Sequence, residues 1–288
     1  MYNEFLDLEE PAGPNLVYVW PVPYQGTVSF AAGTKEAPAA LLRASYEIET
    51  FDPELGVDIS ELCRFQTQPF QRPNVAGPEH LYRYMENTLT DFDPGRDFIL
   101  TLGGEHSVAL PLIRFYARMH PELTVLQVDA HADLRPSFQG SPYSHACIMS
   151  RVRDLGIRFV SLGVRSMDRD ESQWIQNNPE RVKALHPWDL PGPEQAAKLV
   201  REFIGQGPVY ITFDADGLDP SIMPGTGTPE PGGLDYYWLG NFWKNLWPGP
   251  RLVGMDLCEV APQPGSVLSE SVGVKCILKV LMNYFRNT

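Results

Sequence analysis

Short apolar segments alternate with helical segments along most of the chain, and this alternation is the feature that most limits its possible folds. We expect strands at residues 15–20, 97–102, 123–128, 157–162, 182–185, 208–213 and 252–257. We expect helices at residues 36–44, 78–92, 108–119, 145–155, 168–176, 194–204, 236–246 and 267–285. Buried strands separated by helices of about 10 to 15 residues indicate a parallel sheet that is covered on both faces. The sequence therefore predicts an α/β fold with a mainly parallel central sheet.

The domain organisation follows from what the sequence lacks. No Gly/Ser-rich linker, change in composition or internal repeat divides the 288 residues, although this length would also allow two average domains. We expect a single domain over residues 1–288. Residues 46–76 contain several prolines and show no clear hydrophobic period, so we expect irregular structure there.

Charge and cysteine content exclude several classes of protein. A formal net charge of −13 argues against non-specific binding to nucleic acid or to an anionic membrane. The four cysteines form no C-x-x-C pair, which disfavours a disulfide framework or a thiolate zinc site. Residues 1–10 show no basic and apolar leader, and no apolar run approaches the roughly 20 residues of a membrane helix. We expect a cytoplasmic protein without nucleic-acid or membrane partners.

Metal-binding residue types follow the strand predicted at residues 123–128. Asp129, His131 and Asp133 are spaced two residues apart. Because side chains on a strand alternate between its two faces, all three are expected to project to the same side at the strand's end. An isolated D-x-H-x-D motif can hold a metal ion, but it can also be a polar strand end paired with its neighbours.

Two further strand ends carry the same residue types. His106 follows the strand at 97–102 within the motif GGEHS, and Asp214 and Asp216 follow the strand at 208–213. Taken alone, His106 could be structural, and the two aspartates could cap a helix and form a turn. Ligands of parallel sheets bind at the carboxyl ends of the strands, where these residues fall. Together the three strand ends predict one crevice with two histidines and four aspartates.

The charge of this crevice indicates its occupant. Four ionised aspartates repel one another unless cations neutralise them, and two divalent ions would balance them. A carboxylate-rich set without thiolates favours manganese over zinc. Two such ions about 3.5–4 Å apart can share one water and lower its pKa, which gives a hydroxide at neutral pH. With that hydroxide the cluster carries about one negative charge, which favours a cationic substrate group such as guanidinium.

The chain resembles the ureohydrolases, the arginase/agmatinase family of binuclear manganese amidinohydrolases. The resemblance spans nearly the whole chain and is carried by GGEHS (103–107), DAHADLR (129–135), SHA (144–146) and FDADGLDPSIMPGTGTPEPGG (213–233). It implies a three-layer α/β/α sandwich and a homo-oligomer, either a trimer or a hexamer.

The resemblance also implies a ligand set. One Mn2+ ion would be held by His106, Asp129, Asp133 and Asp214. The other would be held by Asp129, His131, Asp214 and Asp216. In this arrangement Asp129 and Asp214 bridge the two ions.

Catalytic roles follow from the same resemblance. A bridging hydroxide would attack the guanidinium carbon, with Asp133 handling its proton and His145 exchanging protons with solvent. Glu259 would bind the guanidinium; considered alone, it could equally belong to a structural ion pair. Glu105 stands where many relatives have aspartate, and we expect it to act only indirectly.

The substrate is suggested by the loop at 136–144. It lacks the asparagines with which arginases bind the amino-acid end of their substrate, and it contains Phe138 and Tyr143 instead. This loop resembles the agmatinase branch, which implies hydrolysis of agmatine to putrescine and urea, with Tyr143 and His145 contributing to substrate binding. Asp168 lies near the position where arginases hold the α-amino group, so arginine remains an alternative, as do guanidinobutyrate and other guanidino or formimino compounds.

Two other classes of protein share parts of this pattern. Metallophosphoesterases share D-x-H but also need G-N-H and further histidines, which the six histidines of this chain do not supply in that context. A catalytically silent family member usually lacks a ligand, and all six predicted ligands are present.

Overall fold

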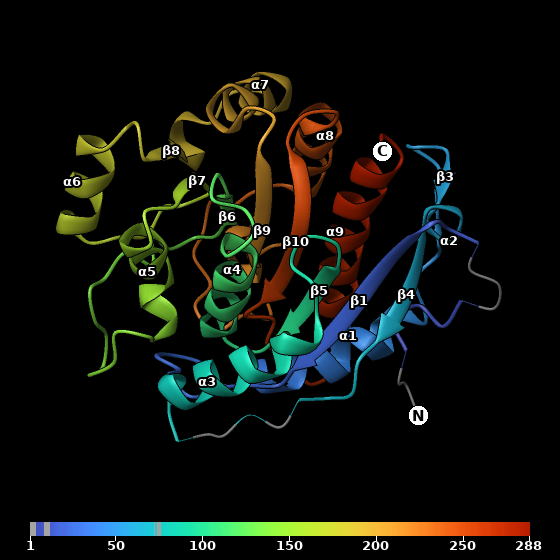
Figure 1. Ribbon diagram of the computed structural model, residues 1–288, viewed down its shortest axis with the longest axis horizontal. Coiled ribbons are helices and arrows are strands. Elements are labelled where there is room, and N and C mark those ends of the chain that lie inside the picture. Colours follow the sequence, from blue (N-terminus) through green and yellow to red (C-terminus); the bar gives the residue numbers. More distant parts are fainter. Residues whose placement is uncertain (1–3, 9–11, 72, 74–75) are drawn as a thin grey trace.

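Eight strands form the central sheet of the protein, of which we describe a computed structural model (Figure 1). Their order across the sheet is β4-β1-β5-β10-β9-β6-β7-β8. The strands are β1 (Asn15–Val22), β4 (Cys63–Thr67), β5 (Phe98–Gly103), β6 (Thr124–Val128), β7 (Arg158–Leu162), β8 (Val182–Leu185), β9 (Pro208–Asp214) and β10 (Arg251–Cys258). Each neighbouring pair in this sheet is parallel, so the prediction of a mainly parallel sheet is confirmed.

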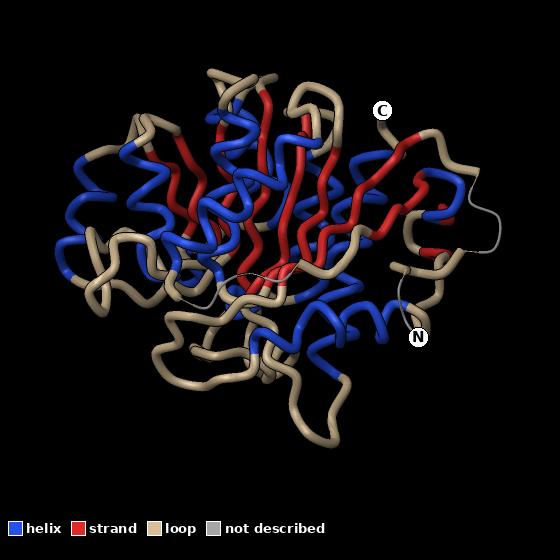
Figure 2. Tube along the Cα trace, turned by 60° about the horizontal axis from the view of Figure 1, so that its bottom comes forward, coloured by secondary structure: helices blue, strands red, loops and turns tan. Residues whose placement is uncertain are grey.

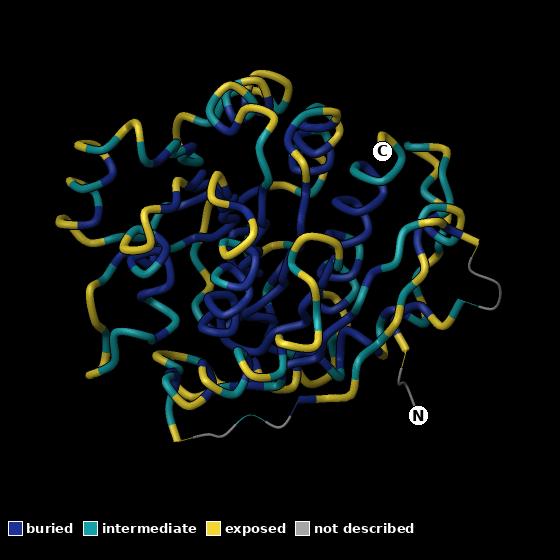
Figure 3. The backbone as a smooth tube through the Cα atoms, in the orientation of Figure 1, coloured by how far each residue is buried: buried dark blue, intermediate teal, exposed yellow. Residues whose placement is uncertain are grey.

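Burial explains why the central strands read as apolar runs. Every residue of β5 and β6 is buried, and β10 is buried after its first residue, Arg251. A parallel sheet with helices on both faces leaves neither side of a strand to water. The buried strands at the centre of the molecule, surrounded by more exposed helices and loops, are visible in Figure 3.

Two layers of helices enclose the sheet. One face packs against α1 (Ala37–Ser45), α7 (Pro193–Ile204), α8 (Tyr236–Leu246) and α9 (Leu268–Phe285). The other face packs against α3 (Pro78–Thr88), α4 (Ala109–Ala117), α5 (Ile148–Asp154) and α6 (Arg169–Asn177). The predicted three-layer α/β/α sandwich is therefore confirmed.

The segment from 46 to 76 was expected to be irregular, and this is wrong for residues 51–67. It contains a two-stranded antiparallel ribbon of β2 (Phe51–Asp52) and β3 (Val57–Asp58), then α2 (Ile59–Leu62) and the edge strand β4. β4 buries only its first residue and pairs along one edge with β1, starting at Asn15 opposite Cys63. An edge strand has a weak hydrophobic signal because its pairing partner, far away in sequence, supplies much of its stability.

Short 3-10 turns lie where several loops enter or leave the sheet. They are η1 (Thr34–Glu36), η2 (Leu89–Asp91), η3 (His106–Val108), η4 (His145–Cys147), η5 (Pro187–Asp189) and η6 (Ala215–Gly217). The turns η3, η4 and η6 contain predicted site residues. Long loops gather at one end of the sheet (Figure 2), and the arrows in Figure 1 show that the strands run towards this end.

The structure describes residues 4–8, 12–71, 73 and 76–288. Residues 1–3 and 9–10, which belong to the N-terminal stretch tested for a leader, lie outside the described residues. Along the described part of the chain, no helix combines the length and the apolar character needed to cross a membrane.

Candidate active site

Four neighbouring strands bring the predicted site residues to one place. His106 follows β5, Asp129 follows β6, Asp214 ends β9 and Glu259 follows β10. These strands are adjacent in the order β5-β10-β9-β6, so their carboxyl ends open into one crevice. At Gly104 the backbone passes so close to Tyr24 that an added Cβ would lie 2.0 Å from the Tyr24 carbonyl oxygen. A residue without a side chain is therefore required between β5 and His106.

The three residues of the D-x-H-x-D motif converge for a reason different from the predicted one. β6 ends at Val128, so strand alternation does not orient them, and that part of the prediction is wrong. The loop turns instead at Asp133, whose φ of 52° lies in the left-handed region. The backbone N–H of His131 donates to Asp129 Oδ1 over 2.6 Å, which fixes the Asp129 carboxylate. A left-handed non-glycine residue at the centre of a crevice is typical of functional sites.

The histidines and aspartates form two sets of potential metal ligands that share one residue. The inner set comprises His106, Asp129 and Asp214, and the outer set comprises Asp129, His131 and Asp216. Within each set, the candidate ligand atoms all lie within 4.8 Å of one another. Asp133 adjoins the inner set, because its Oδ2 is 3.0 Å from His106 Nδ1.

Asp129 has the geometry of a shared ligand. Its Oδ2 lies 3.3 Å from His106 Nδ1, and its Oδ1 lies 3.7 Å from His131 Nδ1. Each carboxylate oxygen therefore faces a different set. Two cations bound in the two sets would have Asp129 between them.

The titration behaviour of the cluster reflects crowded negative charge. Burial, together with the charge of Asp129, raises the pKa of Asp133 to about 7. Burial also raises the pKa of Asp214 well above its usual range, with the charges of Asp216 and Asp129 adding to the effect. Burial alone would lower the pKa of His131, but its bonds to Asp129 and Asp216 outweigh this and raise the pKa to about 11. The cluster thus attracts positive charge.

The donor set fits divalent cations. The side chains of Asp129, Asp133, Asp214 and Asp216 are all buried. Within the described part of the chain, neither lysine nor arginine forms an ion pair with any of these four carboxylates. Buried carboxylates require paired charges or coordinated metals. Oxygen ligands with a minority of imidazoles are those that Mn2+ prefers.

A hydrogen-bond chain behind His106 prepares this residue as a ligand. The Thr212 hydroxyl donates to Asp256 Oδ1 over 3.0 Å, so it accepts from His106 Nε2, which lies 2.8 Å away. The Tyr210 hydroxyl also donates to Asp256, over 2.8 Å. When a cation enters the inner set, His106 with its ring proton on Nε2 would offer the lone pair of Nδ1 to it.

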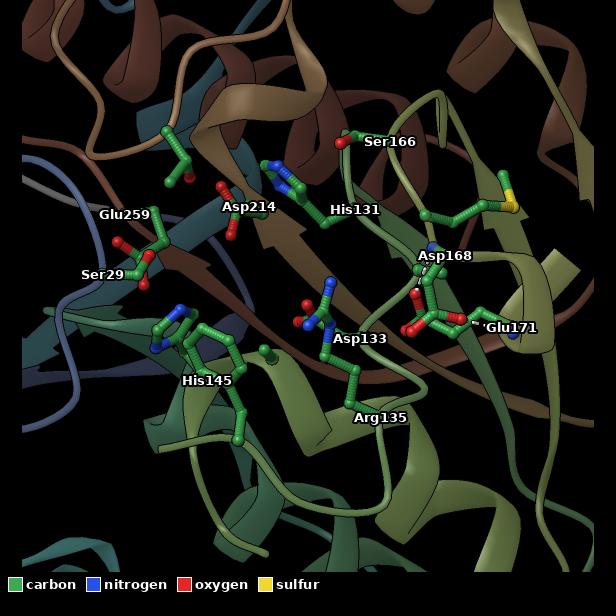
Figure 4. Close-up of a pocket in the computed structure, with 15 residues that line it drawn as sticks. Ser29, His131, Asp133, Arg135, His145, Ser166, Asp168, Glu171, Asp214 and Glu259 are labelled. Carbon is green, nitrogen blue, oxygen red and sulfur yellow. Dashed lines mark hydrogen bonds between the residues drawn. The ribbon is translucent and has the colours of Figure 1, made fainter. Parts of the chain in front are cut away.

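A cavity of about 320 Å3 opens over this cluster. Its wall includes Asp133, Asp214, His145, Asp168 and Glu259. Figure 4 shows His131, Asp133 and Asp214 in the middle of the cavity, with Glu259, Ser29 and His145 on one side and Asp168 and Glu171 on the other. Three of the six predicted metal ligands and all of the predicted substrate-binding residues except Tyr143 thus meet at one opening.

Glu259 is held by its backbone and by a neighbouring loop. It adopts a left-handed φ of 62°, and its Oε1 accepts from the backbone N–H of His106 over 2.7 Å. Burial, followed by the charge of Glu105, raises the pKa of Glu259 to about 8. A cationic group that enters the cavity would lower this pKa again and favour the ionised carboxylate of Glu259.

Two of the predicted substrate residues have additional structural roles. Asp168 lines the cavity, but its Oδ1 also accepts from the backbone N–H of Glu171 and caps α6. Tyr143 packs on Tyr82, with ring centroids 5.1 Å apart, and is not among the residues that line the cavity. Phe138, the other aromatic residue of the 136–144 loop named above, does line the cavity. The substrate-binding roles of Asp168 and Tyr143 stay predictions.

Several residues that support the site were not found from the sequence. Thr212 and Asp256 fix His106, Gln127 Nε2 donates to Asp129 Oδ2 over 2.9 Å, and the Thr27 hydroxyl lies against His145. The only signal for the first two was that polar residues interrupt apolar strands, because a buried polar residue needs a specific partner. Thr27 lies in a loop, where no such signal exists.

Comparisons with known proteins agree with this geometry. Residues 15–282 match the family model described as the arginase family. The chain is 35% identical to the N(1)-aminopropylagmatine ureohydrolase of Synechocystis sp., over 93% of this chain and 89% of that protein. It is 34% identical to the agmatinase of Bacillus anthracis, over 85% and 83%. The solved proclavaminate amidino hydrolase of Streptomyces clavuligerus superimposes with a TM-score of 0.86 at 26% identity, covering 99% of this chain and 97% of that one.

The fold and the carboxylate-rich crevice define an α/β protein of the metal-dependent hydrolase type. The chain belongs to the arginase family, because the family model covers most of it and relatives above 30% identity span nearly all of it. Since these relatives are named ureohydrolases and agmatinases, the predictions of this family and of a hydrolase are confirmed.

Proposed function

We propose that the protein hydrolyses the guanidinium group of agmatine, releasing urea and putrescine, and that it uses two Mn2+ ions. The main support is the pair of ligand sets that share Asp129, placed beneath a cavity whose wall contains Glu259. A crevice with this excess of negative charge suits a small guanidinium substrate.

The metal ions have a defined contribution. When bound by the inner and outer sets, two divalent ions would supply Lewis acidity and neutralise the buried carboxylates. We assign the inner ion to the inner set plus Asp133 and the outer ion to the outer set plus Asp214, in line with the ligands implied by the family resemblance.

The side chains around the cavity have separate tasks in this proposal. Glu259 accepts hydrogen bonds from the substrate guanidinium and orients its carbon over the cluster. Asp133 takes up the proton lost by the attacking water at Oδ1, because its Oδ2 faces His106 Nδ1 and the inner set. His145, on the cavity wall, exchanges protons with solvent and protonates the leaving amine.

A second candidate substrate has specific support. Two relatives, one from Synechocystis sp. at 35% identity and one from Thermus thermophilus at 37%, are named N(1)-aminopropylagmatine ureohydrolases. An agmatine that carries an aminopropyl group would place additional positive charge near Asp168 and Glu171, in a wall that also contains Arg135. This substrate shares the guanidinium chemistry and differs only in the chain that leads out of the cavity.

A substrate panel tests the proposal. Metal-free protein is loaded with Mn2+ and assayed for urea with agmatine, N1-aminopropylagmatine, arginine and 4-guanidinobutyrate, and a matched sample is treated with a chelator. We expect urea from agmatine or its aminopropyl derivative and none after chelation. Equal turnover of arginine would contradict the substrate assignment. Absence of urea with every compound would favour a catalytically silent member.

Three further expectations stay predictions. We propose a single domain over residues 1–288, a cytoplasmic location and assembly into a trimer or hexamer. Sedimentation of the metal-loaded protein measures the last of these.

A further inference from the structure

The hydroxyl of Thr27 lies between His145 and a buried carboxylate. Thr27 belongs to the loop that follows β1, and its Oγ1 donates to Glu105 Oε1 over 2.8 Å. The same oxygen lies 2.9 Å from His145 Nδ1 and accepts from the backbone N–H of His145 over 3.2 Å. All three bonding directions of this hydroxyl are therefore used.

Glu105 fixes the direction of the hydroxyl proton. Its side chain is almost fully buried, at 1% exposure, and Oε2 accepts from the backbone N–H groups of Gly26 and Thr27 over 2.5 and 2.7 Å. Its Oε1 accepts from the hydroxyls of Thr27 and Ser107 over 2.8 and 2.5 Å. All four of these groups are donors, so the Glu105 carboxylate acts only as an acceptor here. The single hydroxyl proton of Thr27 therefore points to Glu105.

The protonation of His145 follows from this arrangement. The Thr27 hydroxyl donates its single proton to Glu105, so towards His145 Nδ1 its oxygen can only accept. Nδ1 must therefore carry the ring hydrogen. A neutral imidazole then has its lone pair on Nε2. Burial lowers the pKa of His145, which favours the neutral ring. The Phe138 ring packs edge-to-face with the imidazole, with ring centroids 5.7 Å apart and planes at 78°.

We propose that Thr27 and Glu105 are positioning residues that hold His145 as its Nδ1–H tautomer, with the Nε2 lone pair available to the cavity. An imidazole fixed in this way can accept a proton at Nε2 without first changing tautomer or turning its ring. The catalytic benefit rests on the proposed function, whereas the tautomer itself does not.

Nitrogen NMR in the solid state measures the tautomer without requiring activity. Histidine-labelled (15N) protein is loaded with Mg2+, a diamagnetic ion, and the His145 signals are assigned by their loss in His145→Asn. We expect a protonated Nδ1 in the wild type and in Thr27→Ser, and a changed or mixed tautomer in Thr27→Val. A wild-type His145 protonated on Nε2 overturns the proposal, and so does a Thr27→Val spectrum identical to that of the wild type.

Steady-state kinetics measures the consequence. Thr27→Val should lower kcat by about 10- to 100-fold, the range for groups that orient a catalytic side chain, with KM and bound manganese nearly unchanged. Thr27→Ser should restore most of the activity. Thr34→Val is a matched control. It removes another buried hydroxyl from the connection between β1 and α1, one that donates to Gln25 Oε1 over 3.3 Å, and it should leave kcat unchanged.

The two measurements separate this proposal from the proposed function. If no guanidino compound is hydrolysed but the Nδ1–H tautomer is observed, the proposed function is wrong and the positioning by Thr27 is supported. If urea is released but Thr27→Val leaves kcat unchanged, the positioning role in catalysis is wrong.

Discussion

The inner and outer ligand sets contain the same residue types but differ in how they are held. The His106 side chain is 1% exposed, and its Nε2 is fixed by Thr212, a residue of the central strand β9. The His131 side chain is 27% exposed, and its Nε2 lies 3.9 Å from Glu230 at the rim of the site. The inner imidazole is thus anchored to the sheet, whereas the outer one is anchored by loops.

This difference in anchoring suggests that the two ligand sets differ in metal affinity and in their response to substrate. A ligand whose second nitrogen is bound inside the sheet keeps its orientation before any ion arrives, which lowers the cost of metal binding. A partly exposed ligand can adjust when substrate enters the cavity. We expect the inner set to bind its ion more tightly and the outer set to respond more strongly to substrate.

The largest effect should come from Asp133→Asn, at the residue next to the inner set. Asparagine tolerates the left-handed φ of this position, so the fold should be retained. Loss of the carboxylate removes both a predicted ligand and a proton acceptor, so we expect urea release to fall by about 10²- to 10⁴-fold. A variant that folds, keeps its manganese and retains near wild-type activity would remove Asp133 from the mechanism.

Glu259→Gln should weaken substrate binding while sparing both ion sites. A hydrogen bond to a charged group contributes about 1.5–3 kcal/mol. Its loss corresponds to a roughly 10- to 150-fold decrease in kcat/KM. We expect manganese content to be unchanged, as measured by elemental analysis alongside the kinetics. An unaltered KM and kcat would show that Glu259 does not bind the guanidinium.

Thr212→Val and Thr228→Val compare the two sets directly. Thr212 fixes His106, and the Thr228 hydroxyl donates to Asp216 Oδ2 over 2.9 Å. Removing the bond behind His106 should lower affinity for one ion by about 10- to 100-fold. Thr228→Val should reduce the metal affinity less, because Asp216 Oδ1 still accepts from the backbone N–H of Ala130. Chelator-competition titrations measure both affinities, and equal losses would contradict the proposed difference between the sets.

Glu230→Gln should have the smallest effect. Glu230 is partly exposed and lies 3.9 Å from His131 Nε2, a distance too long for a hydrogen bond. Because exposed charge pairs contribute little, we expect KM for agmatine to change by less than about threefold. A much larger increase in KM would indicate that this carboxylate contacts the substrate.

The sequence predicted the parallel sheet and its helices because buried strands and amphipathic helices leave strong periodic patterns. It did not predict β4, whose pairing with β1 depends on a contact between segments far apart in the chain. It placed the two histidines and four aspartates of the predicted ligand set at the correct strand ends. For Asp129, His131 and Asp133, however, the predicted geometric reason was wrong. It could not find Thr27, because a threonine in a loop has no pattern that reveals its partners.

Manganese titration of the metal-free protein, with urea release from agmatine and its aminopropyl derivative measured at each step, tests the central claim most directly. The two ligand sets predict that activity rises only as the second ion binds, reaching its maximum at two ions per chain. Full activity with one ion per chain, or no urea at two, would contradict a function based on both sets.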